Sequence, residues 1–261
     1  LQAILFPFAK GRSHPMNKSS PRYLLVGLMA FLMAASTPIG GVDGATSGVV
    51  KEQESSFSVL PERKDYLGTL GLVVKVINGE DGHGSGVIVS SNQVVTNAHV
   101  VASVKKDTKF YIKLESSETR LYNAKILKVY EERDLALLEV EGITFERFAK
   151  TLDTLARVSF LDDIWAIGFP LTLNKALTKG TYQGKIEALS DYGKVFSFLV
   201  VTSSIAPGNS GGGVFIKVDN QVWLLGIPSG VAFAPQEKGG RDVFPNIVYV
   251  IPGPDVANFL K

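Results

Sequence analysis

Short runs of β-branched and aromatic residues recur along the chain from residue 71 to residue 251, separated by clusters of Gly, Asn, Asp and Pro. Runs of this length are typical of β-strands, and the residues between them are typical of turns. The expected strands cover residues 71–77, 86–89, 93–96, 110–114, 121–130, 135–140, 164–170, 180–189, 195–202, 213–218, 222–227 and 247–251. Long segments with helical periodicity are nearly absent, and only residues 255–260 are expected to form a short terminal helix.

The strand pattern divides into two sets. Residues 142–156 carry the weakest strand pattern, so we expect them to connect two halves. Many short strands with evenly spaced turns indicate an all-β barrel or sandwich, and two sets with a connector favour two small barrels. The expected first barrel covers residues 61–145, and the connector with the second barrel covers residues 146–261.

The N-terminal part has a different pattern. Residues 16–22 are basic, and residues 24–35 are an apolar run of about a dozen residues that ends in small residues. This order predicts a secretory signal peptide within an N-terminal extension over residues 1–36, and hence a periplasmic or secreted protein. Extended to Gly41 the run approaches the roughly 20 residues of a membrane span, so an uncleaved membrane anchor is the alternative. Residues 37–60 are rich in Gly, Ser, Thr and Glu and are expected to be a linker.

Composition narrows the chemistry. The chain has 261 residues, 45% of them hydrophobic and 20% charged, with a net charge of +2. It has no cysteine and three histidines, which excludes disulfides and thiol catalysis and argues against zinc–thiolate and multi-histidine metal sites. Lys105-Lys106 is a short basic pair of the expected globular part that a solvated surface explains, so we expect no nucleic-acid partner. We also expect no cofactor.

Residues 206–213 read Ala-Pro-Gly-Asn-Ser-Gly-Gly-Gly and place Ser210 among glycines. A tight turn of this kind exposes a hydroxyl and directs main-chain N–H groups to the same place. Acyl transfer requires both, a nucleophile and donors for the oxyanion. The alternative is an ordinary glycine-rich β-turn between two strands.

A serine nucleophile needs a base, and histidine is the usual one. His99 directly follows a predicted strand, whereas His83 lies in a segment expected to be a flexible loop, so His99 is the better-fixed candidate. Asp134 precedes four apolar residues at the start of a predicted strand and could orient the imidazole. Each residue alone has an ordinary structural interpretation, but the order His, Asp, Ser is the order found in chymotrypsin.

Five segments carry motifs in addition: GSGVIV at 84–89, TNAHVV at 96–101, RDLALL at 133–138, IGFP at 167–170 and PGNSGG at 207–212. Together they resemble the trypsin-like serine peptidases, and most of all their HtrA/DegP branch. The resemblance covers roughly residues 60–261 and implies two perpendicular six-stranded β-barrels with the active site in the cleft between them.

The resemblance also implies roles. His99 is then the general base, Asp134 its orienting acid and Ser210 the nucleophile, with the N–H groups of Gly208 and Ser210 in the oxyanion hole and Asn209 shaping the turn. Residues 226–231 resemble the strand that pairs with the substrate backbone, which implies that Ser229 lies near Asp134. The substrate-binding residues implied in this way are Ser204, Ile205, Ser229, Gly230 and Val231. No carboxylate stands at the expected base of the pocket, so we expect cleavage after small or medium apolar residues.

Three features bear on regulation. Digestive relatives carry an aspartate where this chain has Asn209, and that aspartate pairs with the new N-terminus formed by zymogen cleavage. Asn209 is neutral, so this charge switch is missing here. Members of the HtrA branch usually continue into PDZ domains, and with Lys261 as the last residue we expect a protease domain without one. Many relatives form homotrimers through the segment before the first barrel, for which Phe57, Leu60 and Tyr66 are candidates.

The leading hypothesis is therefore a serine endopeptidase that acts on unfolded or damaged extracytoplasmic polypeptides. A non-catalytic or latent chaperone on the same fold is the alternative from another class. A glutamyl-specific secreted peptidase would require a histidine in the pocket, and His83 is far from the pocket segments in sequence.

Overall fold

The computed structural model describes residues 61–79, 82–102, 108–114, 120–171, 173–189, 194–235 and 241–261. The expected leader, the linker, Phe57, Leu60 and the pair Lys105-Lys106 lie outside these residues. The described helical segments are α1 (Pro61–Leu70), α2 (Ala98–Val101), the 3-10 turn η1 (Glu131–Arg133) and α3 (Gly253–Phe259). No helix among the described residues is long and apolar enough to cross a membrane.

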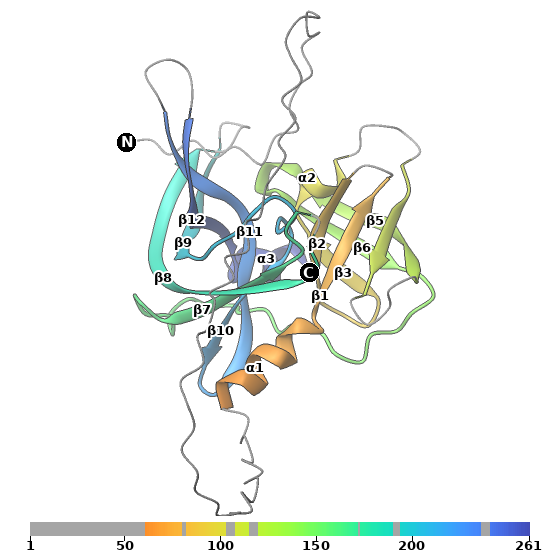
Figure 1. The fold of residues 1–261 in the computed structure, drawn as a ribbon, viewed down its shortest axis with the longest axis horizontal. Helices are drawn as coiled ribbons and strands as arrows, with labels where there is room; N and C mark the ends of the chain where they lie inside the picture. The colour runs from red at the N-terminus through yellow and green to blue at the C-terminus, as the bar shows by residue number, and fades with distance from the viewer. Residues whose placement is uncertain are drawn as a thin grey trace, which may run out of the picture. The chain divides into compact units, whose positions relative to one another are not determined.

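The first six strands close into one antiparallel barrel (Figure 1). In the order of their hydrogen bonding around the barrel they are β1 (Val73–Asn78), β2 (Gly82–Ile88), β3 (Gln93–Thr96), β6 (Leu135–Val140), β5 (Leu121–Tyr130) and β4 (Phe110–Lys113). The pairing of β4 with β1 completes the closure. A closed barrel leaves no strand edge exposed, which makes it a stable arrangement for strands as short as these.

The remaining six strands form a second closed barrel. Around it lie β10 (Gly213–Val218), β11 (Gln221–Pro235), β12 (Arg241–Pro252), β9 (Val195–Thr202), β8 (Ala176–Leu189) and β7 (Asp163–Gly168). The predicted all-β fold with two six-stranded barrels and a short C-terminal helix is confirmed.

The boundaries of β5, β6, β9 and β10 agree with those expected from the sequence, but β11 and β12 are longer. The strand expected over residues 222–227 ends directly before Pro228. Instead, the pairing of β11 with β12 shifts register between Pro228 and Gly230 and again between Val231 and Ala232. Such bulges accommodate residues that disrupt a regular ladder, so the strand continues to Pro235.

Helix α1 was not expected, because its sequence lacks an apolar stripe. Tertiary contacts hold it: the ring of Tyr66 meets Trp165 of β7 edge-on at a centroid distance of 4.9 Å, and Trp165 Nε1 donates to Thr69 Oγ1 at 2.9 Å. Asp65 also pairs with Lys217 of β10 at 2.7 Å. Most helical stability in proteins comes from packing of this kind. Tyr66, a candidate trimer contact, thus packs within its own chain, and the homotrimer stays a prediction.

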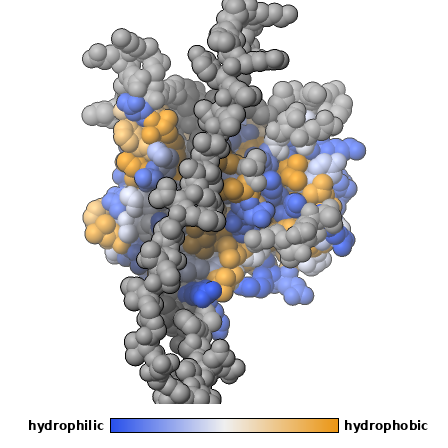
Figure 2. All heavy atoms as spheres, viewed as in Figure 1, coloured by the Kyte–Doolittle hydropathy of each residue, from blue (hydrophilic) through white to orange (hydrophobic). Residues whose placement is uncertain are grey.

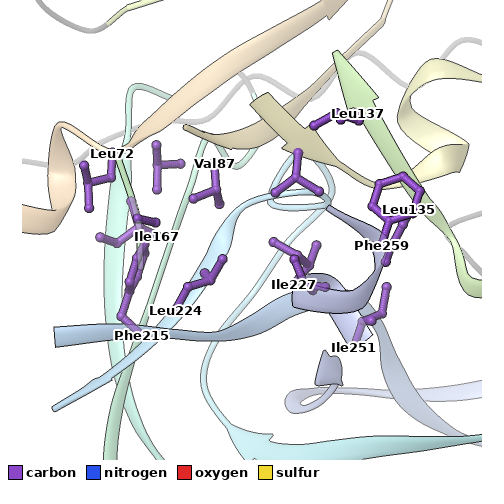
Figure 3. Close-up of a cluster of buried hydrophobic side chains, with 14 of the residues drawn as sticks. Leu72, Val87, Leu135, Leu137, Ile167, Phe215, Leu224, Ile227, Ile251 and Phe259 are labelled. Atoms are coloured by element: carbon purple, nitrogen blue, oxygen red, sulfur yellow. The ribbon is translucent and has the colours of Figure 1, made fainter. Parts of the chain in front are cut away.

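Apolar side chains from both barrels form one shared cluster (Figure 3). Val87 and Leu135 enter it from the first barrel, and Ile167, Phe215 and Ile227 enter it from the second. Each barrel also has its own interior cluster. The outer surface seen in Figure 2 mixes apolar with polar side chains. The shared cluster fixes the two barrels against each other, as any site composed of residues from both requires.

Candidate active site

The Ser210 turn depends on glycines for its shape. Gly208 and Gly211 have φ angles of +98° and +81°, which side-chain-bearing residues rarely adopt. A Cβ atom on Gly211 would lie 2.1 Å from Thr96 Oγ1 and 2.2 Å from the carbonyl oxygen of Ser85. The turn is closed by hydrogen bonds from Asn209 N to Ala206 O and from Gly212 N to Asn209 O. It therefore has a defined conformation that lies directly against the first barrel.

Ser85 of β2 is the residue that holds this turn. Its N–H donates to Ser210 O at 2.8 Å, and its hydroxyl donates to Gly208 O at 2.7 Å and accepts from Phe169 N at 2.9 Å. The side chain is fully buried. Sequence reasoning gave Ser85 no role, although its place between two glycines in the GSGVIV motif was the available indication.

His83 lies on strand β2, so the expectation of a flexible loop was wrong at this residue. Its Nε2 lies 3.2 Å from Phe169 O, and because a carbonyl only accepts, the ring donates. Burial lowers the pKa of His83 below its ordinary 6.5, and the charge of Lys75 lowers it further, although backbone hydrogen bonds at Phe169 and Leu171 oppose this. His83 is far from the turn in sequence, but it lies beside Gly208 in space.

His99, Asp134 and Ser229 form one hydrogen-bonded group. His99 Nδ1 lies 2.9 Å from both carboxylate oxygens of Asp134, and the backbone N–H of His99 donates to Asp134 Oδ1 at 3.0 Å. Because a carboxylate accepts, the neutral ring carries its proton on Nδ1. The Ser229 hydroxyl donates to Asp134 Oδ2 at 2.8 Å. The expected closeness of Ser229 to Asp134 is thus present, and it arises from the bulge of β11 at this residue.

Local backbone geometry directs these side chains. His99 lies in α2, the single helical turn that follows β3. Asp134 ends η1 in the left-handed region, with φ of 57° and ψ of 43°. Aspartate tolerates this conformation better than most residues do. The buried Asn97 side chain donates to Asp134 O at 3.0 Å and so fixes the aspartate backbone from the His99 segment.

Ser210 is 8% exposed and belongs to the turn held by Ser85. No hydrogen bond joins its hydroxyl to His99 among those formed by the described residues. His99 Nε2 is buried and has no hydrogen-bond partner within the same part of the chain. The imidazole therefore bonds Asp134 through Nδ1, and its Nε2 makes no hydrogen bond within the described residues.

The residue before Ser210 is packed closely. Asn209 is 8% exposed, and its Oδ1 is buried with no partner among the described residues. A Cβ atom on Gly168 of β7 would lie 2.5 Å from that oxygen. Gly168 thus provides the space for the Asn209 side chain. That side chain is an uncharged amide.

The expected substrate-binding residues lie on two segments, one on each side of β12. Ser204 Oγ donates to Asn246 Oδ1 at 3.1 Å, and Ile205 N donates to Pro245 O at 3.4 Å. Ile205 is buried in the interior of the second barrel, where Val231 packs against the same cluster. Gly230 pairs with Tyr249 of β12. Among the described residues no three His, Asp or Glu side chains are grouped so that they could hold a metal ion.

Arg133, directly before Asp134, joins the two barrels. Its guanidinium is 2% exposed, binds Asp255 of α3 through Nε and Nη2, and donates to Ser197 O at 2.5 Å. Its carbon Cζ lies 4.7 Å and 4.4 Å from the ring centroids of Phe196 and Phe198. Burial lowers the pKa of Arg133, but an arginine remains charged. The residue next to Asp134 is therefore anchored to the second barrel.

Replacing Asp255 by alanine is expected to lower the free energy of unfolding by at most about 3 kcal/mol, because it leaves the buried Arg133 charge without a partner. The carboxylate is 39% exposed, so water replaces part of the lost contact. Urea unfolding followed by tryptophan fluorescence measures the change.

Asp153→Ala is the matched control, because this aspartate is exposed. It should change the free energy of unfolding by no more than about 0.5 kcal/mol. Equal stability of the two variants would contradict the anchoring role of the Arg133–Asp255 pair.

Two closed six-stranded barrels, with a His–Asp pair on the first and a serine among glycines on the second, are the architecture of the chymotrypsin-like peptidases. The model of the family described as trypsin-like peptidase domain matches residues 84–227. This match covers more than half of the chain, so the chain belongs to that family.

Relatives with curated names are similar over the same region. Protease Do-like 4, mitochondrial, from Arabidopsis thaliana is 31% identical over 185 residues, which are 69% of this chain and 32% of that protein. The serine protease DegP homolog of Plasmodium falciparum is 28% identical over 179 residues, which are 68% of this chain and 19% of that protein. The matched region is thus about a third or less of the length of these relatives.

Among solved structures, the active form of the Rv3671c protease from M. tuberculosis superposes with a TM-score of 0.61 at 19% identity. The superposition covers 78% of this chain and 85% of that chain. The inactive form gives a TM-score of 0.59 at 20% identity. At these identities the likeness shows the fold.

Proposed function

We propose that the chain is a serine endopeptidase that hydrolyses peptide bonds through His99, Asp134 and Ser210. The observation that supports this best is the pairing of His99 Nδ1 with the Asp134 carboxylate at 2.9 Å, which leaves a buried Nε2 without a partner among the described residues. An imidazole oriented in this way accepts a proton at Nε2, as a general base must.

The chemistry follows in two halves. Ser210 Oγ attacks the scissile carbonyl while His99 Nε2 takes its proton, and Asp134 remains ionised and stabilises the imidazolium. His99 then gives the proton to the leaving amine, and the acyl-enzyme on Ser210 is hydrolysed by water with the same base. The N–H groups of Gly208 and Ser210 stabilise the oxyanion in both halves, with Asn209 shaping the turn.

The proposed primary pocket is neutral. The serine hydroxyl of Ser204 has the amide of Asn246 as its partner, and Ile205 and Val231 are aliphatic. These three residues offer neither a carboxylate to a basic substrate side chain nor a cation to an acidic one. We therefore infer a preference for small or medium apolar residues at P1, the residue before the cleaved bond.

Unfolded or damaged polypeptides outside the cytoplasm are the proposed substrate class. The support comes from the resemblance to the Do-like and DegP relatives and from the leader pattern of residues 16–36. One of these relatives, protease Do-like 4, is named as a mitochondrial protein. A non-catalytic chaperone on the same fold is the alternative, and covalent labelling of Ser210 separates the two.

Digestion of reduced and alkylated serum albumin tests the proposed specificity. Mass spectrometry of the new termini is expected to show enrichment of Ala, Val and Leu at P1, with Lys, Arg and Glu at or below their frequency in the substrate. The physical reason is that the partners of Ser204 among the described residues, Asn246 and Thr178, are both neutral.

The Ser210→Ala protein, purified in parallel, reports cleavage by contaminating proteases. Enrichment of Lys or Arg at P1 would contradict the proposed pocket without contradicting the proposed activity. Enrichment of Glu would instead favour the glutamyl-specific alternative.

A further inference from the structure

Strand β2 presents two side chains to the second barrel. His83 and Ser85 are two residues apart, so they point to the same side of the strand. Ser85 binds Gly208 O and Phe169 N, and His83 binds Phe169 O. The two residues thus hold both polar groups of Phe169, one from each side.

The segment from Phe169 to Leu171 in turn contacts the Ser210 turn. Leu171 N donates to Pro207 O at 2.6 Å, and a Cβ atom on Gly208 would lie 2.4 Å from Phe169 O and 2.9 Å from His83 Nε2. Leu171 has a φ of 53°, which is strained for leucine and persists only where the surroundings hold it. The contact between this segment and the turn is therefore close and imposed by the fold.

The orientation of the peptide between Pro207 and Gly208 follows from this contact. In a trans peptide the C=O and N–H groups point in opposite directions. Because Leu171 N holds Pro207 O on one side, the Gly208 N–H points to the other. Glycine itself offers little resistance to rotation of this peptide, so its direction depends on where Leu171 is held.

We propose that His83 is a positioning residue for the oxyanion hole: its hydrogen bond to Phe169 O holds the Phe169–Leu171 segment, which fixes the direction of the Gly208 N–H. This inference rests on the proposed function, because the Gly208 N–H matters for catalysis only if Ser210 is acylated. It gives a role to the one histidine of the described residues that the proposed mechanism does not use.

The test compares the reaction of a fluorophosphonate with Ser210 in wild type, His83→Ala, His83→Asn and His83→Gln. The glutamine amide is long enough to donate to Phe169 O, and the asparagine amide is too short. The limiting rate of labelling is expected to fall about 10- to 100-fold in the Ala and Asn variants, less than the full loss of an oxyanion donor. The half-saturating probe concentration should stay unchanged, and the Gln variant should recover most of the rate.

Tyr111→Leu is the matched control. Tyr111 is a half-buried ring of the first barrel in the same cross-strand row as His83, because Ile77 pairs with both residues. Its limiting rate should remain within about twofold of wild type. A rate loss in this control as large as that in His83→Ala, or full activity of the Ala and Asn variants, would overturn the inference.

The two proposals fail in different ways. No labelling of wild type would contradict the proposed activity. Labelling of wild type with equal rates in all His83 variants would contradict only the role of His83. If His83→Ala does not fold, as judged by circular dichroism, the comparison of Asn with Gln decides the question alone.

Discussion

Replacing Ser210 by alanine is expected to abolish covalent labelling by a fluorophosphonate and to lower the cleavage of fluorescein-labelled casein by about a million-fold. The reason is that no other hydroxyl can take the place of this nucleophile in the turn held by Ser85. Gel fluorescence measures labelling, and release of soluble fluorescein measures cleavage. Loss of both signals with intact circular dichroism is the result that supports the enzyme over the chaperone alternative.

Ser90→Ala is the control for this substitution. Ser90 is a partly buried serine in the loop between β2 and β3, and its hydroxyl donates to Gln93 Oε1. Its labelling and cleavage should stay within about twofold of wild type. Labelling that persists in Ser210→Ala, or casein cleavage at the wild-type rate, would remove Ser210 from the mechanism.

Replacing Asp134 by asparagine is expected to lower kcat about ten-thousand-fold while the fold stays intact. The amide cannot fix the proton on His99 Nδ1 as the carboxylate does, and it carries no charge to stabilise the imidazolium. Asparagine tolerates the left-handed backbone at this position, so the substitution should not strain η1. Casein cleavage measures the loss, and circular dichroism checks the fold.

Asp153→Asn removes one exposed carboxylate elsewhere and should leave kcat within about twofold of wild type. An Asp134→Asn protein with kcat within tenfold of wild type would mean that His99 is not oriented through this carboxylate. Loss of structure in Asp134→Asn would instead show that the carboxylate holds the backbone N–H of His99 mainly for stability.

Local sequence patterns predicted most of the strands because each barrel is built from short apolar runs between turns. They failed where distant contacts decide the structure. Helix α1 forms because Tyr66 and Thr69 meet Trp165, a residue far along the chain. Strand β11 continues past Pro228 because its pairing with β12 accommodates Pro228 and Gly230 through bulges.

The residues of the candidate site also differ in whether local sequence could reveal them. His99, Asp134 and Ser210 could be found from residue type, order and motif. The parts played by Ser85 and His83 could not, because they depend on how strand β2 faces the second barrel. The contact of Arg133 with Asp255 was equally hidden, since nothing in either local sequence indicates the other.

The attachment of the Ser210 turn to β2 of the other barrel has a consequence for a peptidase of the proposed kind. A chain emerging from the ribosome is itself an unfolded polypeptide and thus resembles its own substrate. The base and its aspartate are synthesised first, and the serine comes later with the second barrel. Until both barrels have closed and docked, Ser85 does not hold the turn, so a partly synthesised chain does not yet carry the assembled site.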